Sequence, residues 1–384
     1  MVMYRKIEYN VLLGRIKESD KNIHVISGPR GVGKTTMVQQ VLTNLEIEGY
    51  KTVFGSADYP APGSSAWLEQ LWVNAVEQRL SGKTVLVIDE VQKIPDWLKT
   101  INCLWQKEII KNASLTVILI DSTVFRMSED LSCYCRYLTM GHWAFAEMKK
   151  AFGYNLNQFL FFGGYPGSVE YLDDYEGWKT YMLDSLIETT LSRDLFMMNR
   201  VEKPVLLRNL FKLVCNRANS VISYTAMQSY LEEKVNTTTL SNYLSLLADI
   251  GLVVGLQKFS GNKERKRGSS PKLLPLNTGL INAMQEAKKI DQLSLPSFKE
   301  SLLKVAFGAA LYRKRELGVS LNYWKKGIDE IDFLFVNNTN IRVTAFDLIL
   351  NKESRNSIEV LIKDYPAIET IKVGKDEILF EEFL

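Results

Sequence analysis

Apolar runs rich in β-branched residues alternate with longer stretches of helical periodicity over the first ~150 residues. The runs predict strands at Asn22–Ser27, Thr52–Gly55, Thr84–Ile88, Leu115–Ile120 and Arg136–Met140. The stretches between them predict helices that include Lys34–Ile47, Ala66–Leu80 and Trp97–Lys111. Because strands that alternate with helices are joined by crossovers, the pattern predicts an α/β domain with a parallel sheet.

The pattern changes beyond this sheet. From Ala144 to about Arg200 the sequence is helical, interrupted at Gly163–Gly167, and Pro204 marks a boundary. Three short helices are then expected at Leu206–Arg217, Ser223–Glu232 and Thr237–Ile250, followed by a hairpin up to about Leu276. After Pro296 the pattern predicts a helix over Phe298–Lys314 and strands around Leu321–Trp324, Ile331–Val336 and Ile341–Phe346. Three helices and a hairpin are typical of a winged helix.

A glycine-rich loop follows the first strand and opens the first helix. Its sequence, Gly28-Pro29-Arg30-Gly31-Val32-Gly33-Lys34-Thr35, satisfies G-x-x-x-x-G-K-[ST] in full. Glycines let backbone N–H groups turn toward a β-phosphate, and the helix adds its positive end. Lys34 is expected to reach the β- and γ-phosphates, Thr35 to ligate Mg²⁺, and Thr36 to extend the polar lining. The alternative is a glycine-rich turn that ends in Lys-Thr by chance.

Two acids follow the third predicted strand. Asp89 is expected to hold Mg²⁺ through water, at the end of a strand next to the strand that precedes the glycine-rich loop. Glu90 would polarise a water for attack on the γ-phosphate. The 55 residues from Lys34 to Asp89 leave room for the strand Thr52–Gly55 between them. By itself, an acid pair at a strand end is a common solubilising feature.

Together with the loop, the run Asp89-Glu90-Val91-Gln92-Lys93-Ile94-Pro95-Asp96-Trp97 resembles a bacterial and archaeal family of AAA-type P-loop ATPases. Further shared motifs are Gly163-Gly164-Tyr165-Pro166, Ser192-Arg193-Asp194-Leu195 and Asn277-Thr278-Gly279-Leu280. The resemblance implies ATP or ADP with Mg²⁺ as ligands. It also implies four parts: an ATPase core (1–143), a helical lid (144–203), a winged helix (204–285) and a C-terminal α/β domain similar to PD-(D/E)xK nucleases (286–384).

The chain departs from this family at two places in the ATPase core. A Thr-Gly-Ser-Ser run is replaced by Ile120-Asp121-Ser122-Thr123, where a polar group normally orients the attacking water. Ser122, or Asp121 if it points inward, would take that role. The family's Leu-Ala-Gly-Arg run is replaced by Leu131-Ser132-Cys133-Tyr134, which removes an arginine. Of Arg126, Arg136 and Arg193, Arg193 is favoured as the phosphate-contacting arginine because it lies in a matched motif.

The appended domains give weaker signals. The third winged-helix helix offers Thr237, Thr238, Asn242 and Tyr243 as exposed positions but no Arg or Lys, so base readout has little support. Six basic residues against one acid lie between Lys258 and Lys272, and Lys263–Arg267 in the wing is expected to contact double-stranded DNA non-specifically. The alternatives are a solvated loop, and a winged helix that contacts protein.

In the last domain, Glu300 and Glu330-Ile331-Asp332 match positions of the nuclease-like family. The family's Glu-x-Lys is replaced by Ala345-Phe346-Asp347, so the expected cleavage site lacks its lysine. A nuclease site needs Mg²⁺ ligands and a nearby lysine. We therefore expect this domain to be catalytically inactive.

Composition adds bounds to this picture. At 384 residues, with 46% hydrophobic and 24% charged residues, the chain suits two or three globular domains. No apolar run approaches the ~18 residues of a membrane span, and the first residues do not resemble a signal peptide, so we expect no membrane partner and a cytoplasmic location. The four cysteines and two histidines lack the spacing of a zinc site.

The leading hypothesis is therefore an ATP-hydrolysing switch, with turnover slowed by the altered residues. The alternatives are a nucleotide-holding scaffold for a protein or DNA partner, and an ATP-dependent nuclease.

Overall fold

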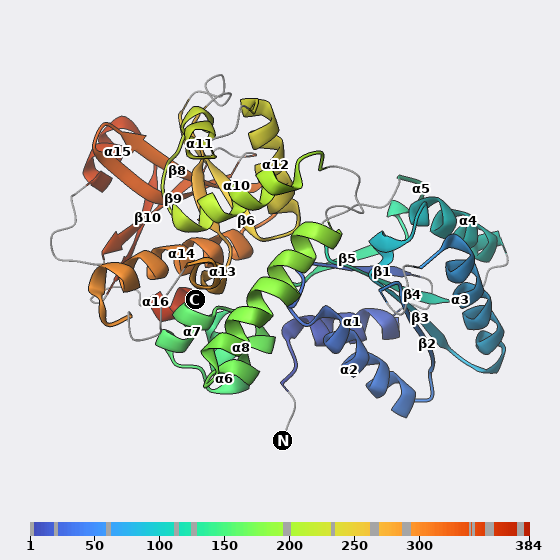
Figure 1. Ribbon diagram of the computed structural model, residues 1–384. Coiled ribbons are helices and arrows are strands. Elements are labelled where there is room, and N and C mark those ends of the chain that lie inside the picture. The colour runs from blue at the N-terminus through green and yellow to red at the C-terminus, as the bar shows by residue number, and fades with distance from the viewer. Residues whose placement is uncertain are drawn as a thin grey trace. The chain divides into compact units, whose positions relative to one another are not determined.

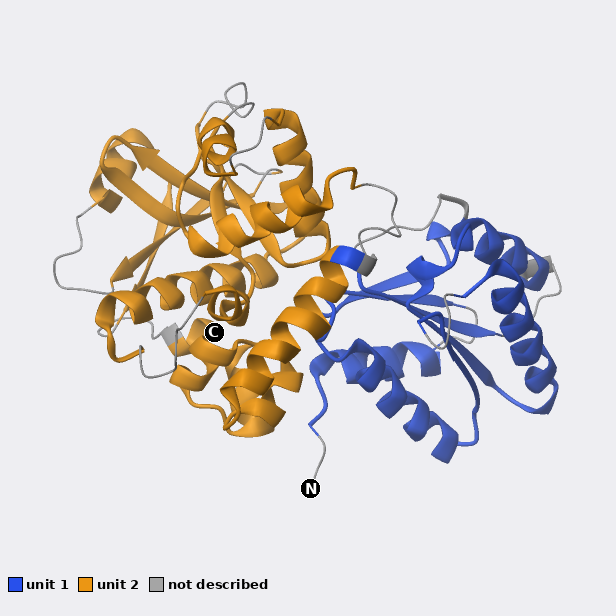
Figure 2. Ribbon diagram, in the orientation of Figure 1, with its two compact units in different colours: residues 1–141, 192–200 blue, residues 142–191, 201–384 orange. Residues whose placement is uncertain are grey.

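The computed structural model describes residues 4–18, 22–58, 63–110, 115–123, 129–194, 201–231, 235–261, 269–285, 293–337, 339, 342–349, 357–374 and 380–384. Two compact units divide the chain, residues 1–141 with 192–200, and residues 142–191 with 201–384 (Figure 2). We call them unit 1 and unit 2. The predicted domain boundaries cut the chain more finely than these units do.

Unit 1 is built on a five-stranded parallel sheet in the order β2-β3-β4-β1-β5 (Figure 1). Its strands are β1 (Ile23–Ser27), β2 (Lys51–Ser56), β3 (Thr84–Asp89), β4 (Thr116–Asp121) and β5 (Cys135–Thr139). Its helices are α1 (Ile7–Glu18), α2 (Lys34–Ile47), α3 (Ser65–Gln78), η1 (Arg79–Ser81), η2 (Val91–Lys93), α4 (Trp97–Ile110) and α5 (Glu129–Ser132), together with the last three residues of η5 (Thr190–Asp194). All five predicted strands are confirmed to within a residue or two.

One expectation about the order of the strands was wrong. β3 does not lie next to β1, because β4 pairs with both and separates them. The strand between the two motifs in sequence, β2, lies instead at the edge of the sheet. The sequence lists strands in chain order, whereas the sheet order depends on which way each crossover turns.

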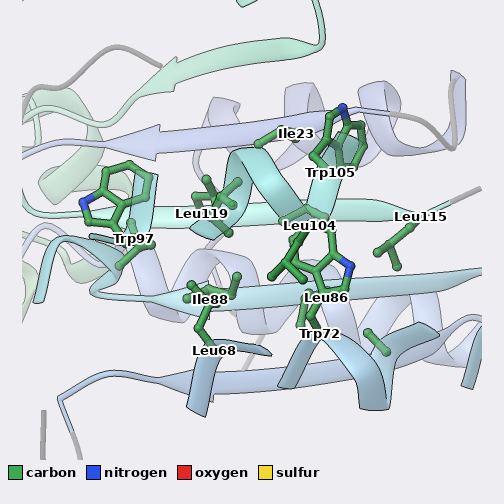
Figure 3. Close-up of a cluster of buried hydrophobic side chains, with 14 of the residues drawn as sticks. Ile23, Leu68, Trp72, Leu86, Ile88, Trp97, Leu104, Trp105, Leu115 and Leu119 are labelled. Atoms are coloured by element: carbon green, nitrogen blue, oxygen red, sulfur yellow. The ribbon is translucent and has the colours of Figure 1, made fainter. Parts of the chain in front are cut away.

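Apart from His24 and residues at their ends, the central strands are apolar, because helices cover both faces of the sheet. Figure 3 shows the face toward α3 and α4, where Ile23, Leu86, Ile88, Leu115 and Leu119 pack on Leu68, Trp72, Trp97, Leu104 and Trp105. The other face, which includes Ile26, Val85, Val87, Ile118 and Ile120, packs on α1 and α2. This double burial fixes the carboxyl ends of β1, β3 and β4, where polar residues begin.

Unit 2 begins with helices and ends with a mixed six-stranded sheet in the order β11-β10-β9-β8-β6-β7. The helices are α6 (Phe145–Phe152), α7 (Leu156–Phe162), η3 (Pro166–Tyr171), α8 (Tyr175–Thr180), η4 (Tyr181–Glu188), α10 (Pro204–Asn216), α11 (Tyr224–Leu231), α12 (Thr237–Asp249), α13 (Thr278–Met284), α14 (Pro296–Lys314), α15 (Ser357–Asp364) and α16 (Phe380–Phe383). The strands are β6 (Val253–Lys258), β7 (Lys272–Pro275), β8 (Val319–Lys326), β9 (Asp329–Asn337), β10 (Val343–Ile349) and β11 (Glu369–Gly374).

The three helices and the hairpin expected after Pro204 are present as α10, α11, α12 and the antiparallel pair β6–β7. The hairpin does not end there, because β6 also pairs with β8 and so joins the C-terminal strands in one sheet. The helix expected over 298–314 is α14, and β8, β9 and β10 are the three strands expected after it. α15 and β11 were not anticipated.

Candidate functional site

The loop between β1 and α2 is shaped by its glycines. Gly28, Gly31 and Gly33 have φ values of 151°, 79° and 88°, in a region that side chains disfavour. A Cβ on Gly28 would lie 1.9 Å from the carbonyl oxygen of Met140, whereas one on Gly33 would meet no atom within 4 Å. Within residues 22–58, which are fully described, no side chain caps the start of α2 and no acid lies in its first turn. Its first N–H groups therefore suit an anion.

Lys34 is the first residue of α2 and is buried. Its Nζ donates to the carbonyl oxygens of Gly28 (2.8 Å) and Pro29 (2.9 Å), and to the hydroxyl of Ser122 (3.3 Å). An ammonium at the positive end of a helix is unfavourable unless acceptors or an anion surround it. The loop carbonyls satisfy this need here, and a phosphate would satisfy it better because it carries charge.

Thr35 and Asp89 meet beside the loop. The Thr35 hydroxyl donates to Oδ2 of Asp89 (3.1 Å), and the backbone N–H of Glu90 donates to Oδ1 (3.0 Å). Burial, together with the negative charge of Glu90, raises the pKa of Asp89 to about 6. A divalent cation here would reverse that shift and keep Asp89 ionised.

The Thr35 hydroxyl and the Asp89 carboxylate are suitable ligands for Mg²⁺. No group of three or more His, Cys, Asp or Glu among the described residues could hold a metal. Mg²⁺ typically takes one or two carboxylates and completes its shell with water and phosphate oxygens. A hydroxyl and a carboxylate beside a phosphate-binding loop therefore fit Mg²⁺ with a nucleotide.

Glu90 follows β3 in a strained conformation, with a φ of 54° that is rare for a residue other than glycine. Its carboxylate accepts hydrogen bonds from the Ser122 hydroxyl (2.8 Å) and from the Gln92 amide (2.7 Å). Burial would raise its pKa, but the charges of Lys93, Lys34 and Arg30 and the bond from Ser122 outweigh burial and lower it. Glu90 is therefore an ionised, buried carboxylate that can accept a proton.

The two residues after β4 differ in what they contact. Ser122 lies between Lys34 and Glu90 and hydrogen bonds to both. Asp121 is fully buried, and its Oδ1 accepts bonds from the N–H (2.5 Å) and hydroxyl (2.7 Å) of Thr123. Its Oδ2 has no hydrogen-bond partner among the described atoms. Of the two residues, it is therefore Ser122 that hydrogen bonds to the expected base.

Burial raises the pKa of Asp121 from 3.8 to about 7, and the charge of Glu90 adds to the increase against the hydrogen bonds from Thr123. The folded state thus holds this proton more tightly than the unfolded chain does, so stability falls as pH rises from about 4 to about 7. We expect the free energy of unfolding of Asp121→Asn, relative to that of wild type, to increase by roughly 2–4 kcal/mol across that range. Chemical denaturation at a series of pH values measures it.

Asp364→Asn is the matched control, because Asp364 lies in a solvent-accessible ion pair with Lys326. Its stability difference from wild type should stay nearly constant between pH 4 and 7. An Asp121→Asn difference that is equally flat would show that the carboxyl is ionised throughout.

The structure separates the candidate arginines. Arg136 is exposed on β5 and pairs in register with His24, three residues before the end of β1 at Ser27, so it lies away from the loop. Arg126 and the side chain of Arg193 lie outside the described residues. Arg30, which the sequence suggested only as a loop residue, lies 3.3 Å from Asp58 and 3.9 Å from Glu90.

Two residues at this site escaped the sequence analysis. Asp58 follows β2, and Lys93 ends η2; the Lys93 Nζ lies 2.6 Å from Asp58 and 3.5 Å from Glu90. A signal existed for both. Asp58 comes just after a parallel strand, at the same edge as the other acids, and Lys93 is three residues from Glu90.

Unit 2 corrects two expectations about nucleic-acid contact. Tyr243 of α12 is not exposed but buried, and its hydroxyl accepts a hydrogen bond from the N–H of Lys203 (2.9 Å). Lys272, counted in the basic cluster, is fully buried on β7 and bonds to Glu330 (2.6 Å) and Asp332. Lys263–Arg267 lies outside the described residues, so the expected wing contact stays a prediction.

The acids expected at the C-terminal site are engaged by cations. Lys304 lies 3.8 Å from Glu300 and 3.6 Å from Asp332, and Asn219 donates to Asp332 (3.1 Å). Burial would raise the pKa of Asp332, but the charges of Lys272 and Lys304 outweigh burial and lower it. Asp332 is therefore ionised, and cations of the same unit lie beside both carboxylates.

Comparison with known families agrees with the loop geometry. Residues 20–149 match the family model described as an AAA domain. Unit 1 thus carries an AAA-type P-loop ATPase domain. An AAA domain implies ATP as the ligand, typically with Mg²⁺. Residues 153–291 match a domain of unknown function, DUF8612. A search of curated proteins finds no match.

Among solved structures, similarity is found to a replication initiator DnaA bound to AMPPCP and single-stranded DNA, with 14% identity, a TM-score of 0.33 and coverage of 63% of this chain and 88% of that one. It is also found to a Thermotoga maritima RuvB mutant, with 15% identity, a TM-score of 0.32 and coverage of 64% and 86%. A third is AMPPCP-bound DnaA from Aquifex aeolicus, with 15% identity, a TM-score of 0.31 and coverage of 64% of this chain and 89% of that one.

In the described part of the chain, no helix is long and apolar enough to span a membrane.

Proposed function

We propose that this chain hydrolyses ATP to ADP and phosphate and uses the cycle as a switch. The observation that carries the proposal is the series Lys34–Ser122–Glu90, in which one hydroxyl joins the loop lysine to an ionised carboxylate at the ends of β1, β3 and β4. The phosphate-binding lysine, Lys34, and the proton acceptor, Glu90, are thus bridged by a single side chain, that of Ser122. That spacing suits attack by water on a terminal phosphate.

Each residue of the site has a role in this proposal. Residues 28–36 hold the phosphates through loop N–H groups and Lys34, and Thr35 and Asp89 would hold Mg²⁺, which when bound offsets phosphate charge. Glu90 accepts the proton of the attacking water. Ser122 orients Glu90 and that water, since its hydroxyl already donates to the carboxylate.

The first test is ATP affinity. Lys34→Ala removes the charge-assisted bonds to phosphate, so ATP binding should weaken about 10- to 100-fold, as expected for hydrogen bonds to charged groups. Titration calorimetry with Mg-ATP measures it. Lys17→Ala is the control, because Lys17 is a more exposed lysine of unit 1 that pairs with Glu48. No saturable ATP binding by wild type, or equal binding by Lys34→Ala, would refute the proposal.

A second candidate function is a module that holds nucleotide without turning it over. Asp121 motivates it, because a buried carboxyl with one oxygen lacking a hydrogen-bond partner lies next to the residue that contacts Glu90. If Asp121 ionises near the γ-phosphate, its charge opposes that of the phosphate. Nucleotide that stays bound through purification, with no phosphate formed, would favour this function.

Contact of Lys263–Arg267 with duplex DNA remains part of the proposal, as does a protein partner. Phosphate release should be measured with and without duplex DNA, because stimulation would link DNA to the ATPase. We do not propose nuclease activity. The ion pairs of Lys272 and Lys304 with Glu330, Asp332 and Glu300 support an inactive C-terminal domain, since metal binding would have to displace them.

A further inference from the structure

Four charged side chains close a ring beside the phosphate-binding loop. In order they are Arg30, Asp58, Lys93 and Glu90, with successive distances of 3.3, 2.6 and 3.5 Å, and 3.9 Å from Glu90 back to Arg30. They come from the loop, the end of β2, η2 and the end of β3. The charges alternate in sign, so each acid has two cations beside it.

The two cations of the ring are not held equally. The Lys93 side chain is 2% exposed and makes the short contact with Asp58, whereas that of Arg30 is 24% exposed and both its distances are longer. Burial would raise the pKa of Asp58, but the bond and charge of Lys93 and the charge of Arg30 lower it. If Arg30 moved away, Lys93 would still lie beside both acids, and the charge of Lys34 would still act on Glu90. Arg30 can therefore leave without stranding a buried charge.

We infer that Arg30 is the arginine that contacts the γ-phosphate, supplied by the loop of the same chain, and that Asp58 holds it until ATP arrives. The inference rests on the proposed ATPase function and names a residue for a role that no other arginine side chain among the described residues of unit 1 takes. Arg30 lies between the glycines that shape the loop, and its guanidinium already lies near the expected base. A phosphate offers it the bidentate geometry that arginine prefers.

The inference explains the difference between Arg30 and Lys93. A group that must move toward a phosphate should be held by longer and more exposed contacts. A group that fixes the base should be buried and tightly paired. Asp58 then competes with the γ-phosphate for Arg30, and ADP, which lacks that phosphate, does not draw Arg30 away.

The test compares ATP with ADP in Arg30→Ala. ADP affinity should stay within about 3-fold of wild type, ATP affinity should fall about 10-fold, and phosphate release should fall at least about 100-fold, since such arginines contribute about 10³–10⁵ to turnover. Trapping of Mg-ADP by aluminium fluoride, which imitates the phosphate in transit, should be lost. Arg30→Lys should restore part of the ATP preference.

Arg79→Ala is the matched control, because Arg79 also pairs with an acid of unit 1, Glu108 at 2.6 Å, away from the loop. Asp58→Asn should change the ATP affinity in the opposite direction from Arg30→Ala. ATP should bind about 3- to 10-fold more tightly, because the carboxylate that competes with the γ-phosphate for Arg30 is lost, and the ADP affinity should stay unchanged. ADP binding by each variant reports that it is folded.

The outcomes separate this inference from the function on which it rests. If Arg30→Ala keeps the ATP preference, the fluoride trapping and the turnover of wild type while Lys34→Ala loses binding, Arg30 is refuted and the nucleotide site stands. If Lys34→Ala binds ATP normally, the proposed function fails. If wild type binds ATP without turnover, the ATP preference and the trapping still decide the role of Arg30.

Discussion

Glu90→Gln should bind ATP as tightly as wild type but release phosphate at least about 100-fold more slowly, as expected when a general base is lost. Glutamine keeps the shape of the side chain and can still accept the Ser122 hydrogen bond, whereas it cannot take a proton. The effect should be large because the charges of Lys93, Lys34 and Arg30 keep Glu90 ionised at neutral pH. Steady-state phosphate release and Mg-ATP titration together separate turnover from binding.

Glu108→Gln is the control for replacing a buried acid of unit 1. Glu108 is 5% exposed, close to the 9% of Glu90, and pairs with Arg79 away from the loop. It should leave turnover per bound ATP unchanged. A Glu90→Gln variant that turns over at the wild-type rate would remove Glu90 from the mechanism and leave only the phosphate-binding part of the site.

The part of the site that the sequence predicts is the part that is continuous in the chain. Residues 28–36 form one loop and one helix start, so local glycine conformation and the lysine are sufficient to specify it. Asp89 and Glu90 were found because they end an apolar strand, and parallel strands bring their carboxyl ends to one edge. Ser122 followed instead from the family resemblance, because it stands where the family has a polar group after the fourth strand.

What the sequence left out depends on contacts between distant segments. The Asp58–Lys93 pair spans 35 residues. Asp58 lies in no motif, and Lys93 lies in the run 89–97 but had no role assigned to it. Strand order is also hidden, because the direction of each crossover decides that β4 lies between β1 and β3. Residues 7–18 of unit 1 fold as α1, whose Tyr9, Leu12 and Ile16 cover one face of the sheet, although their polar neighbours mask the pattern.

In unit 2, the sequence could not show which polar side chains are exposed to solvent and which are buried. Tyr243 lies on a helix with mixed faces, and only the position of Lys203 shows that its hydroxyl is satisfied inside the fold. Lys272 sits in a run of basic residues, so its charge suggested solvent or phosphate. Its side chain is instead buried because Glu330 and Asp332, about 60 residues later in the chain, face it from β9.

Because of this burial, Lys272→Met has the largest loss of stability that we expect, about 3 kcal/mol in the free energy of unfolding, at the low end for a broken buried pair. Methionine fills a similar volume next to Phe333 but leaves two carboxylates without their shared cation. Lys304 and Lys325, at 3.6 and 2.7 Å from Asp332 and Glu330, limit the loss. Chemical denaturation at pH 7, followed by tryptophan fluorescence, measures it.

The loss of stability caused by Lys272→Met should depend on pH and should be smaller in acid. The pKa values of Glu330 and Asp332 are lowered in the folded state because, although burial would raise them, the neighbouring lysine charges outweigh it. Their pairing therefore stabilises the fold above their unfolded pKa values of about 4 and is lost as pH falls through the folded ones, so the cost of Lys272→Met should shrink in acid. Lys326→Met, which breaks an exposed pair with Asp364, should cost less than about 1 kcal/mol at any pH. If Lys272→Met costs no more than this control, the buried lysine does not hold the hairpin to β9, and the pairing energy merely offsets the cost of burying the three charges.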